Sequence, residues 1–115
     1  MGIDHSSQGI LTVDLLPEPD MGTDLENVAN IARDEADCDV VVDFSSVDII
    51  TSSSIAKLLK LNKLMNGCGH RLVLCGLVAV TKQIFTLANL DQVFDFADDK
   101  SAALTTIKNA QHVNS

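Results

Sequence analysis

Residues 40–61 read VVVDFSSVDIITSSSIAKLLKL, and this stretch decides the fold. It opens on Val40-Val41-Val42, a continuous β-branched run that is typical of a strand covered on both faces, as in parallel sheets. A helical pattern follows, and its predicted apolar side carries Ile55, Leu58, Leu59, Asn62 and Met65. Gly67 and Gly69 are expected to end this helix, and Leu72-Val73-Leu74 is the next strand-like run. Strand, helix and strand in this order predict a right-handed βαβ crossover.

The chain before this unit predicts further strands and a helix. Residues 10–16 alternate apolar and polar side chains, as a half-buried strand does, and residues 1–5 are expected to form a short partner strand. A proline-containing loop follows. Thr23 and Glu26 then have capping-box spacing, which predicts a first helix from about Asp24 to Asp34.

The chain after the unit predicts two more helices and a strand. A helix is expected over residues 79–88, closed by a left-handed Asn89, and a short strand over residues 93–96. Asp98 is expected to cap a last helix, with residues 110–115 as a frayed tail. The side chains predicted to face inward from these two helices are Ile84, Phe85, Leu87, Ala102, Ala103, Leu104 and Ile107. The whole pattern, over residues 1–115, is that of a single α/β domain with a small mixed sheet of about four or five strands and about four helices.

Composition excludes several classes of protein. The chain has 115 residues, a net charge of −8 and 46% hydrophobic residues, which is typical of a globular domain. No apolar run reaches the roughly 18 residues that span a bilayer, and the first residues lack the features of a signal peptide, so we expect no membrane contact and a cytoplasmic location. Cys38, Cys68 and Cys75 are odd in number and lack C-x-x-C spacing. They predict reduced, largely packed thiols, with neither a disulfide framework nor a metal site.

Charge is unevenly distributed along the chain. Residues 1–48 hold twelve acids and one base, whereas residues 49–90 hold five bases and no acid. The net charge of −8 argues against binding to nucleic acid. Lys57, Lys60 and Lys63 recur along one side of the predicted helix, as in a solvated face or a docking stripe for an acidic partner.

Four consecutive hydroxyl residues, Thr51-Ser52-Ser53-Ser54, precede the apolar side of the second helix. One of them is expected to be the N-cap, because its oxygen can accept a bond from a free N–H of the first helical turn. Capping does not account for all four. The start of a helix also tolerates an added phosphate, which would change the charge of the surrounding surface.

The stretch 40–61 resembles the central signature of the STAS domain family, in particular the bacterial anti-sigma factor antagonists. In that family a buried strand ending in Asp is followed by a hydrophobic pair, then Asp-Ser-Ser-Gly and an amphipathic helix. Residues 40–43 resemble the strand, Ile49-Ile50 the pair, and residues 55–64 the helix. A weaker likeness covers about residues 37–104.

The resemblance implies a partner switch. The unphosphorylated antagonist would bind a serine-kinase anti-sigma factor and free the sigma factor, phosphorylation would end that binding, and a PP2C-type phosphatase would reverse it. The motif assigns the phospho-acceptor to Ser53, with Ser52, Thr51 and Ser54 as alternates. Two departures stand out, since Thr51 occupies the position of the family Asp and Ser54 that of the family Gly. The expected partner-binding residues are Asp48, Thr51, Ser52, Ser53, Ser54, Lys57 and Lys60.

The sequence fits other functions less well. An enzyme is disfavoured because His5, His70 and His112 are scattered and lack a spaced carboxylate or His partner, and we expect no catalytic residue and no cofactor. A response-regulator receiver would need more acids than Asp14 beside Asp43 to hold Mg²⁺, so Asp43 is expected to be a strand-end or turn residue. The alternative within the resembled family is a STAS domain without the switch, either a scaffold in a signalling assembly or an accessory subunit of a transporter ATPase.

Overall fold

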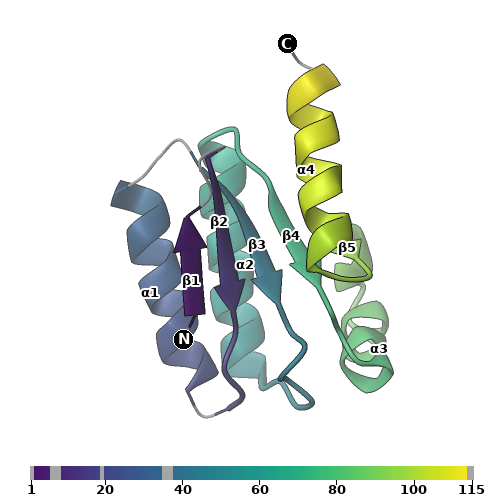
Figure 1. Cartoon of the computed structure of the whole chain (residues 1–115). Helices are drawn as coiled ribbons and strands as arrows, with labels where there is room; N and C mark the ends of the chain where they lie inside the picture. Colours follow the sequence, from purple (N-terminus) through teal and green to yellow (C-terminus); the bar gives the residue numbers. More distant parts are fainter. Residues whose placement is uncertain (1, 6–8, 19, 35–37, 114–115) are drawn as a thin grey trace.

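Five strands form one sheet in the order β1-β2-β3-β4-β5 (Figure 1). The computed structural model describes residues 2–5, 9–18, 20–34 and 38–113. β1 pairs with β2 in antiparallel fashion, whereas β2, β3, β4 and β5 are parallel. The strands are β1 (Gly2–His5), β2 (Ile10–Asp14), β3 (Asp39–Asp43), β4 (Leu72–Cys75) and β5 (Asp95–Ala97). The predicted α/β class and mixed sheet are therefore confirmed, including the short N-terminal partner strand.

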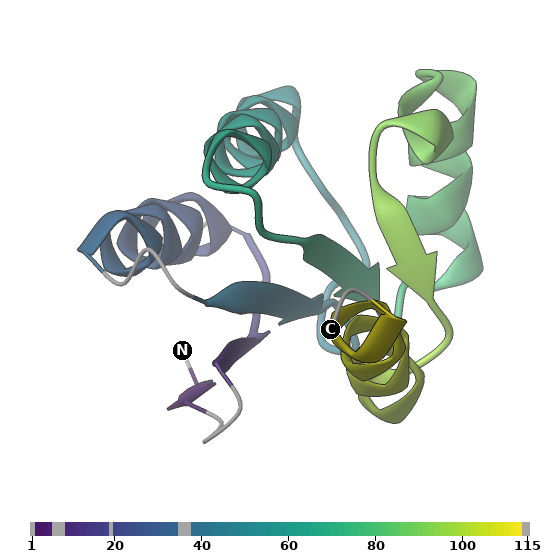
Figure 2. The ribbon, with the colours of Figure 1, turned by 90° about the horizontal axis from the view of Figure 1, so that it is seen from above.

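Helices cover both faces of this sheet. α1, α2 and α3 lie on one face and α4 on the other (Figure 2). The α-helices are α1 (Met21–Asp34), α2 (Ser52–Gly67), α3 (Ala79–Leu87) and α4 (Lys100–Val113), with a 3₁₀ helix η1 (Leu90–Gln92) before β5. None of the helices in the described ranges is both long and apolar enough to cross a bilayer.

The continuous valine run is explained by this two-sided cover. Val40 and Val42 point into the larger core beneath α1, α2 and α3, while Val41 packs with Val73 and Ile107 on the α4 side. All three β3 valines are fully buried. Alternate side chains of a strand point to opposite faces, so a strand covered on both faces needs apolar residues at every position.

The four phenylalanines of the chain pack together under α3. The ring of Phe85 lies 5.8 Å from those of both Phe94 and Phe96, and 6.4 Å from that of Phe44, between ring centroids. Edge-to-face pairs of this kind add to the free energy gained by burial. They hold α3 against the segment that follows β3.

The first helix starts earlier than the sequence predicts. α1 begins at Met21, so Thr23 is an exposed residue within the helix and the predicted Thr23 N-cap is wrong. The reason lies in Asp24, whose backbone N–H already donates to the Asp20 carbonyl (3.1 Å) and whose buried carboxylate accepts the Leu16 N–H (3.1 Å). These bonds tie the preceding loop to the first turn.

Two side chains predicted to face inward are exposed. On α2, Leu61 is 1% exposed and Leu59 is 36% exposed, because α2 packs against α1 as well as the sheet and its buried side is rotated accordingly. On α3, Leu87 is the last residue and is 76% exposed. Phe85 is buried and Ile84 packs against the core, as predicted.

The remaining differences are shifts of one or two residues near the C-terminus. β5 begins at Asp95, because the N–H groups of Val93 and Phe94 bond to the Leu90 carbonyl in the turn that closes η1 rather than to a neighbouring strand. Asp99 caps α4 through a 2.7 Å bond from the Ala102 N–H to its carboxylate, so the Asp98 cap is wrong by one position. α4 extends to Val113, into the predicted tail, whose fraying remains a prediction. Asn89 adopts the expected left-handed backbone, with φ of 60°.

Candidate functional site

The start of α2 follows the carboxyl end of β3 at one edge of the sheet (Figure 1). Thr51 is the N-cap, with an extended backbone and a hydroxyl that accepts the Ser54 N–H at 3.2 Å. The prediction that one of the four hydroxyls caps the helix is confirmed. Thr51 can fill this role because a hydroxyl, like the family Asp, accepts bonds from the free N–H groups of the first turn.

Glu18 is a part of this site that the sequence did not reveal. Its Oε2 accepts three hydrogen bonds, from the Ser54 hydroxyl (2.7 Å), the Thr51 hydroxyl (2.8 Å) and the Thr51 N–H (3.0 Å). Burial raises the pKa of this carboxyl, but the bonds from Ser54 and Thr51, with the nearby Lys57 charge, more than offset that effect. The pKa of Glu18 is therefore lower than its ordinary value, and the carboxylate is charged at neutral pH.

The four hydroxyls consequently differ in environment. Ser54 is 2% exposed and its oxygen is bonded to Glu18, whereas Ser52 and Ser53 are both exposed. Within the described part of the chain, no hydrogen bond from the hydroxyl of Ser52 or Ser53 is found. Thr51 is exposed as a residue, but its hydroxyl is engaged by Glu18 and by the helix. Ser52 and Ser53 are the two hydroxyls that stay available to a partner.

Lys57 and Lys60 lie further along α2, on the side toward α1. Lys57 is only partly exposed and its Nζ lies 2.9 Å from the Glu26 carboxylate of α1. Lys60 is exposed. Asp48 is exposed in the loop before the site, and its carbonyl accepts a bond from the buried Thr81 hydroxyl of α3 at 3.4 Å. The predicted binding residues therefore lie along one loop and one helix, although Ser54 is buried beneath the surface.

An apolar patch missing from the predicted set lies beside this loop. Ile49 is 65% exposed and Val80 is 64% exposed, with Val78 at 40%. The Thr81–Asp48 bond keeps the first turn of α3 beside the 48–49 segment. Single exposed apolar side chains are common, but here the exposed Ile49 and the α3 segment with Val78 and Val80 come from two elements that this bond holds together. Sequence periodicity alone could not join residues from these two elements.

Asp43 has the turn role expected from the sequence. Its Oδ1 accepts the N–H of Ser45 at 2.9 Å as well as the Ser45 hydroxyl, and its Oδ2 lies 3.9 Å from Lys100 Nζ. Gly76 passes beside this turn with φ of 69°, and a Cβ there would lie 2.6 Å from Asp43 Oδ1. Among the described residues, no group of three or more His, Cys, Asp or Glu side chains is arranged to hold a metal ion.

His70 lies at the other end of the sheet, away from the start of α2. Its Nδ1 is 3.3 Å from the carboxylate of the buried Asp39, which also accepts the Arg71 N–H. The side chains of His5 and His112 lie outside the described residues. All three cysteines belong to the described part of the chain and are thiols rather than disulfides; Cys68 is exposed rather than packed, while Cys38 and Cys75 are buried.

Comparison with known proteins identifies the family. The family model of the STAS domain matches residues 23–103. The chain belongs to the STAS domain family. A search of curated protein sequences found no match.

Solved structures of STAS proteins share the fold of this domain. A serine-to-glutamate variant of RsbS from Moorella thermoacetica has 18% identity and a TM-score of 0.83, covering 96% of this chain and 97% of its own. A chain in the molecular architecture of the stressosome has 18% identity and a TM-score of 0.76, with coverages of 96% and 98%. The unphosphorylated anti-sigma factor antagonist SpoIIAA has 11% identity and a TM-score of 0.70, with 96% coverage of both chains. SpoIIAA of Bacillus in its phosphorylated form has 12% identity, a TM-score of 0.68 and coverages of 91% and 97%.

Proposed function

We propose that this STAS domain is a regulatory, non-enzymatic protein-binding module of the cytoplasm that is switched by phosphorylation of Ser53. In its unphosphorylated form it binds a serine-kinase anti-sigma factor, which then releases its sigma factor. The observation that carries the proposal is the contrast at the start of α2, where Ser52 and Ser53 are exposed while Ser54 and Thr51 are engaged by Glu18. Of the two exposed serines, Ser53 is the one at the acceptor position of the family motif. The similarity to an antagonist solved in unphosphorylated and phosphorylated forms supports it.

The site suits a modification that changes binding without unfolding the domain. Ser53 belongs to the first turn of α2, where free N–H groups and the positive end of the helix dipole stabilise added negative charge. The N-cap is Thr51 rather than Ser53, so we expect modification of Ser53 to leave the cap in place. A phosphate would add about two negative charges and bulk to the exposed surface at the start of α2, with a desolvation cost to any apolar partner.

Glu18 supports the choice of acceptor. Ser54 is buried, so a kinase could modify it only after the Glu18 bond is broken and the first turn of α2 opened. Ser53 needs no such rearrangement, and the same exposure makes phosphoserine accessible to a PP2C-type phosphatase. Glu18 also supplies a carboxylate at the helix start, where the family Asp is replaced by Thr51 in this chain.

Two matched variants test the electrostatic switch. Ser53→Asp places a negative charge at the second residue of α2, and Ser101→Asp places the same charge at the second residue of α4, on the other face of the sheet. With the cognate serine-kinase anti-sigma factor, calorimetry should show Ser53→Asp binding at least about tenfold more weakly. Ser101→Asp should bind as the native protein does. Equal affinity of the native protein and Ser53→Asp would refute the switch.

A STAS domain without the switch is the second candidate function. The T-S-S-S motif at positions 51–54 and the similarity to a stressosome chain favour a fixed scaffold in a signalling assembly, and an accessory subunit of a transporter ATPase belongs to the same class. In that case Ser53 remains unmodified in the presence of the kinase. Co-purification in a large assembly at constant stoichiometry, with or without ATP, would favour the scaffold.

A further inference from the structure

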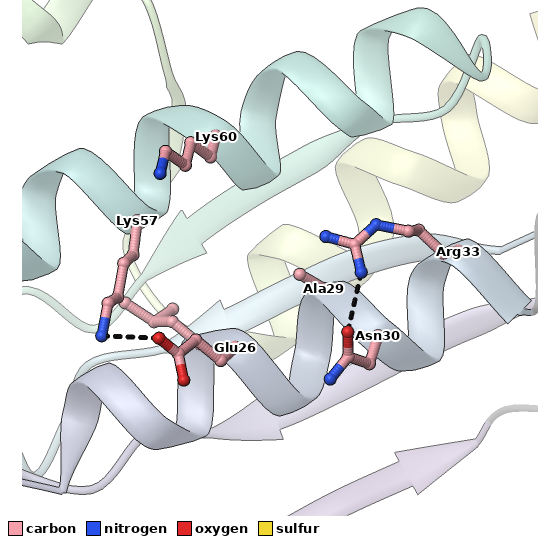
Figure 3. A pocket seen from close by; sticks show the side chains of 7 residues that line it. Glu26, Ala29, Asn30, Arg33, Lys57 and Lys60 are labelled. Carbon is pink, nitrogen blue, oxygen red and sulfur yellow. Dashed lines mark hydrogen bonds and ion pairs between the residues drawn. The ribbon is translucent and has the colours of Figure 1, made fainter.

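A groove of about 320 Å³ runs between α1 and α2. The two helices lie side by side on the same face of the sheet (Figures 1 and 2). Leu25 and Ala29 give the groove an apolar part. Its polar lining residues are Glu26, Asn30, Arg33, Lys57 and Lys60 (Figure 3).

The groove is positively charged in an acidic protein. Three cations line it, and the single acid, Glu26, is paired with Lys57 at 2.9 Å. Arg33 donates a 2.7 Å bond to the neutral amide oxygen of Asn30, which leaves its charge in place. Within the described residues, Lys60 has no acidic partner. The lining therefore carries an excess of two positive charges, whereas the chain has a net charge of −8.

The cations are spread along the groove rather than gathered at one point. Lys57 and Lys60 belong to α2, and Arg33 belongs to α1. Along the groove, Lys57 lies at the Glu26 end, Arg33 lies toward the opposite end, and Lys60 lies between them (Figure 3). Glu26 and Arg33 are separated by two helical turns, which corresponds to about 10 Å along α1. One small anion cannot contact both ends at once, but a chain with several carboxylates can.

We propose that this groove binds an acidic peptide segment of a partner protein. Carboxylates two helical turns apart would reach Arg33 at one end and Lys57 at the other, where the partner carboxylate would share the lysine with Glu26, and Lys60 would attract the segment between them. An apolar side chain of the segment would rest on Ala29. The long-range attraction between such a segment and the groove accelerates their encounter. This surface shares Lys57 and Lys60 with the expected partner-binding residues of the switch, but it also requires Arg33 and does not require Ser53, so the two proposals can be tested separately.

The test uses a fluorescent acidic peptide whose glutamates lie two helical turns apart with leucines between them. Binding is followed by anisotropy for the native protein, Arg33→Glu, Lys60→Glu and the control Lys63→Glu. Lys63 is an exposed lysine of the same helix outside the groove, so its reversal changes the net charge equally. We expect Arg33→Glu and Lys60→Glu to raise the dissociation constant about tenfold or more, and Lys63→Glu to change it less than about twofold.

The outcomes separate this proposal from its rivals and from the switch. Ser53→Asp should bind the peptide as the native protein does. If the switch proposal were wrong, the peptide result would therefore be unaffected. If all three charge reversals weakened peptide binding equally, the peptide would be attracted by net charge alone, and the proposal that it binds in the groove would be wrong. Absence of saturable binding, or displacement of the peptide by inorganic phosphate at equal concentration, would also overturn it. Circular dichroism of each variant verifies that the fold is retained.

Discussion

The Ser54 hydroxyl donates a 2.7 Å hydrogen bond to Glu18 Oε2 across 36 residues of sequence. This bond joins the loop after β2 to the first turn of α2, and the same oxygen also accepts two bonds from Thr51. Glu18 thus supplies, from a distant loop, the carboxylate that the Asp of the family motif supplies next to the helix. The relationship explains how a buried serine is accommodated at position 54, where the family has Gly, and why Ser54 is not exposed as Ser52 and Ser53 are.

Removal of Glu18 should destabilise the domain. Glu18→Ala leaves the buried Ser54 hydroxyl without its acceptor, which costs about 1–3 kcal/mol of unfolding free energy. Glu26→Ala is the control, because it removes a carboxylate from a largely exposed ion pair worth about 0–1 kcal/mol. Urea unfolding of both variants measures the difference. An equal cost for the two would contradict the assigned role of Glu18.

The contribution of Glu18 should depend on pH in one direction. Its pKa is lower in the folded state than its ordinary value of 4.5, so the folded state favours the charged form. The stabilisation is fully present above pH 4.5 and is lost as the pH falls through the folded pKa. The difference in unfolding free energy between native protein and Glu18→Ala should therefore shrink in acid. A difference that stays constant or grows below pH 4.5 would be inconsistent with this.

The release of Ser54 should widen the choice of phospho-acceptor. In Glu18→Ala the Thr51 and Ser54 hydroxyls lose the bond that occupies them, so the kinase should modify these residues in addition to Ser53. Peptide fragmentation by mass spectrometry assigns the phosphate to each position. Modification of Ser53 alone in Glu18→Ala would show that Glu18 plays no part in acceptor choice.

Three glycines should respond differently to alanine. Gly67 lies at the end of α2 with open space around it, so Gly67→Ala should stabilise by about 0.5–1 kcal/mol. Gly69 has φ of 75° and open space, so its substitution costs about 1 kcal/mol or more. At Gly76 a positive φ is combined with a Cβ 2.6 Å from Asp43 Oδ1, and the cost should reach about 3 kcal/mol. Thermal unfolding ranks the three variants. A cost at Gly76 no larger than that at Gly69 would contradict the close approach of Gly76 to the Asp43 turn.

The cysteines should differ in reactivity. Burial first, and then the nearby Asp43 charge, raise the pKa of Cys75 from 9.0 to about 12, and the thiolate is the reactive form. Iodoacetamide at mildly alkaline pH should label the exposed Cys68 and leave Cys75 unmodified until the protein is unfolded. Peptide mass spectrometry measures both sites in one sample. Comparable labelling rates in the folded protein would contradict the burial of Cys75.

The sheet and its crossover were predictable because their signals are local. The Val40–Val42 run and the apolar side of α2 each lie within one element, and the order of elements fixes the crossover. The burial of Leu61 in place of Leu59 on α2 was not predictable, since it depends on packing against α1. The start of α1 was missed because it depends on the bond from the Leu16 backbone N–H to the Asp24 carboxylate, which joins the helix to the loop before it and which the capping-box pattern does not reveal.

The candidate site was predictable only in part. The hydroxyl run at 51–54 and its capping role are evident from the sequence because they involve neighbouring residues. Glu18 is one of twelve acids in the first 48 residues, and nothing in its local sequence distinguishes it from the others. Ile49 and Val80 come from a loop and a helix that meet only in the folded protein. The periodicity of the sequence within one element therefore could not predict this apolar patch.

The central claim is the phosphorylation of Ser53, and mass spectrometry of the intact protein and its peptides tests it most directly. The protein is incubated with ATP and its cognate serine kinase, beside Ser53→Ala, in which Thr51 still caps α2. We predict one phosphate, located on Ser53, and none on the Ser53→Ala variant. Phosphate on another hydroxyl of 51–54 in the native protein would keep the switch and contradict the assignment to Ser53. No phosphate, while a control antagonist is modified under the same conditions, would contradict the switch itself.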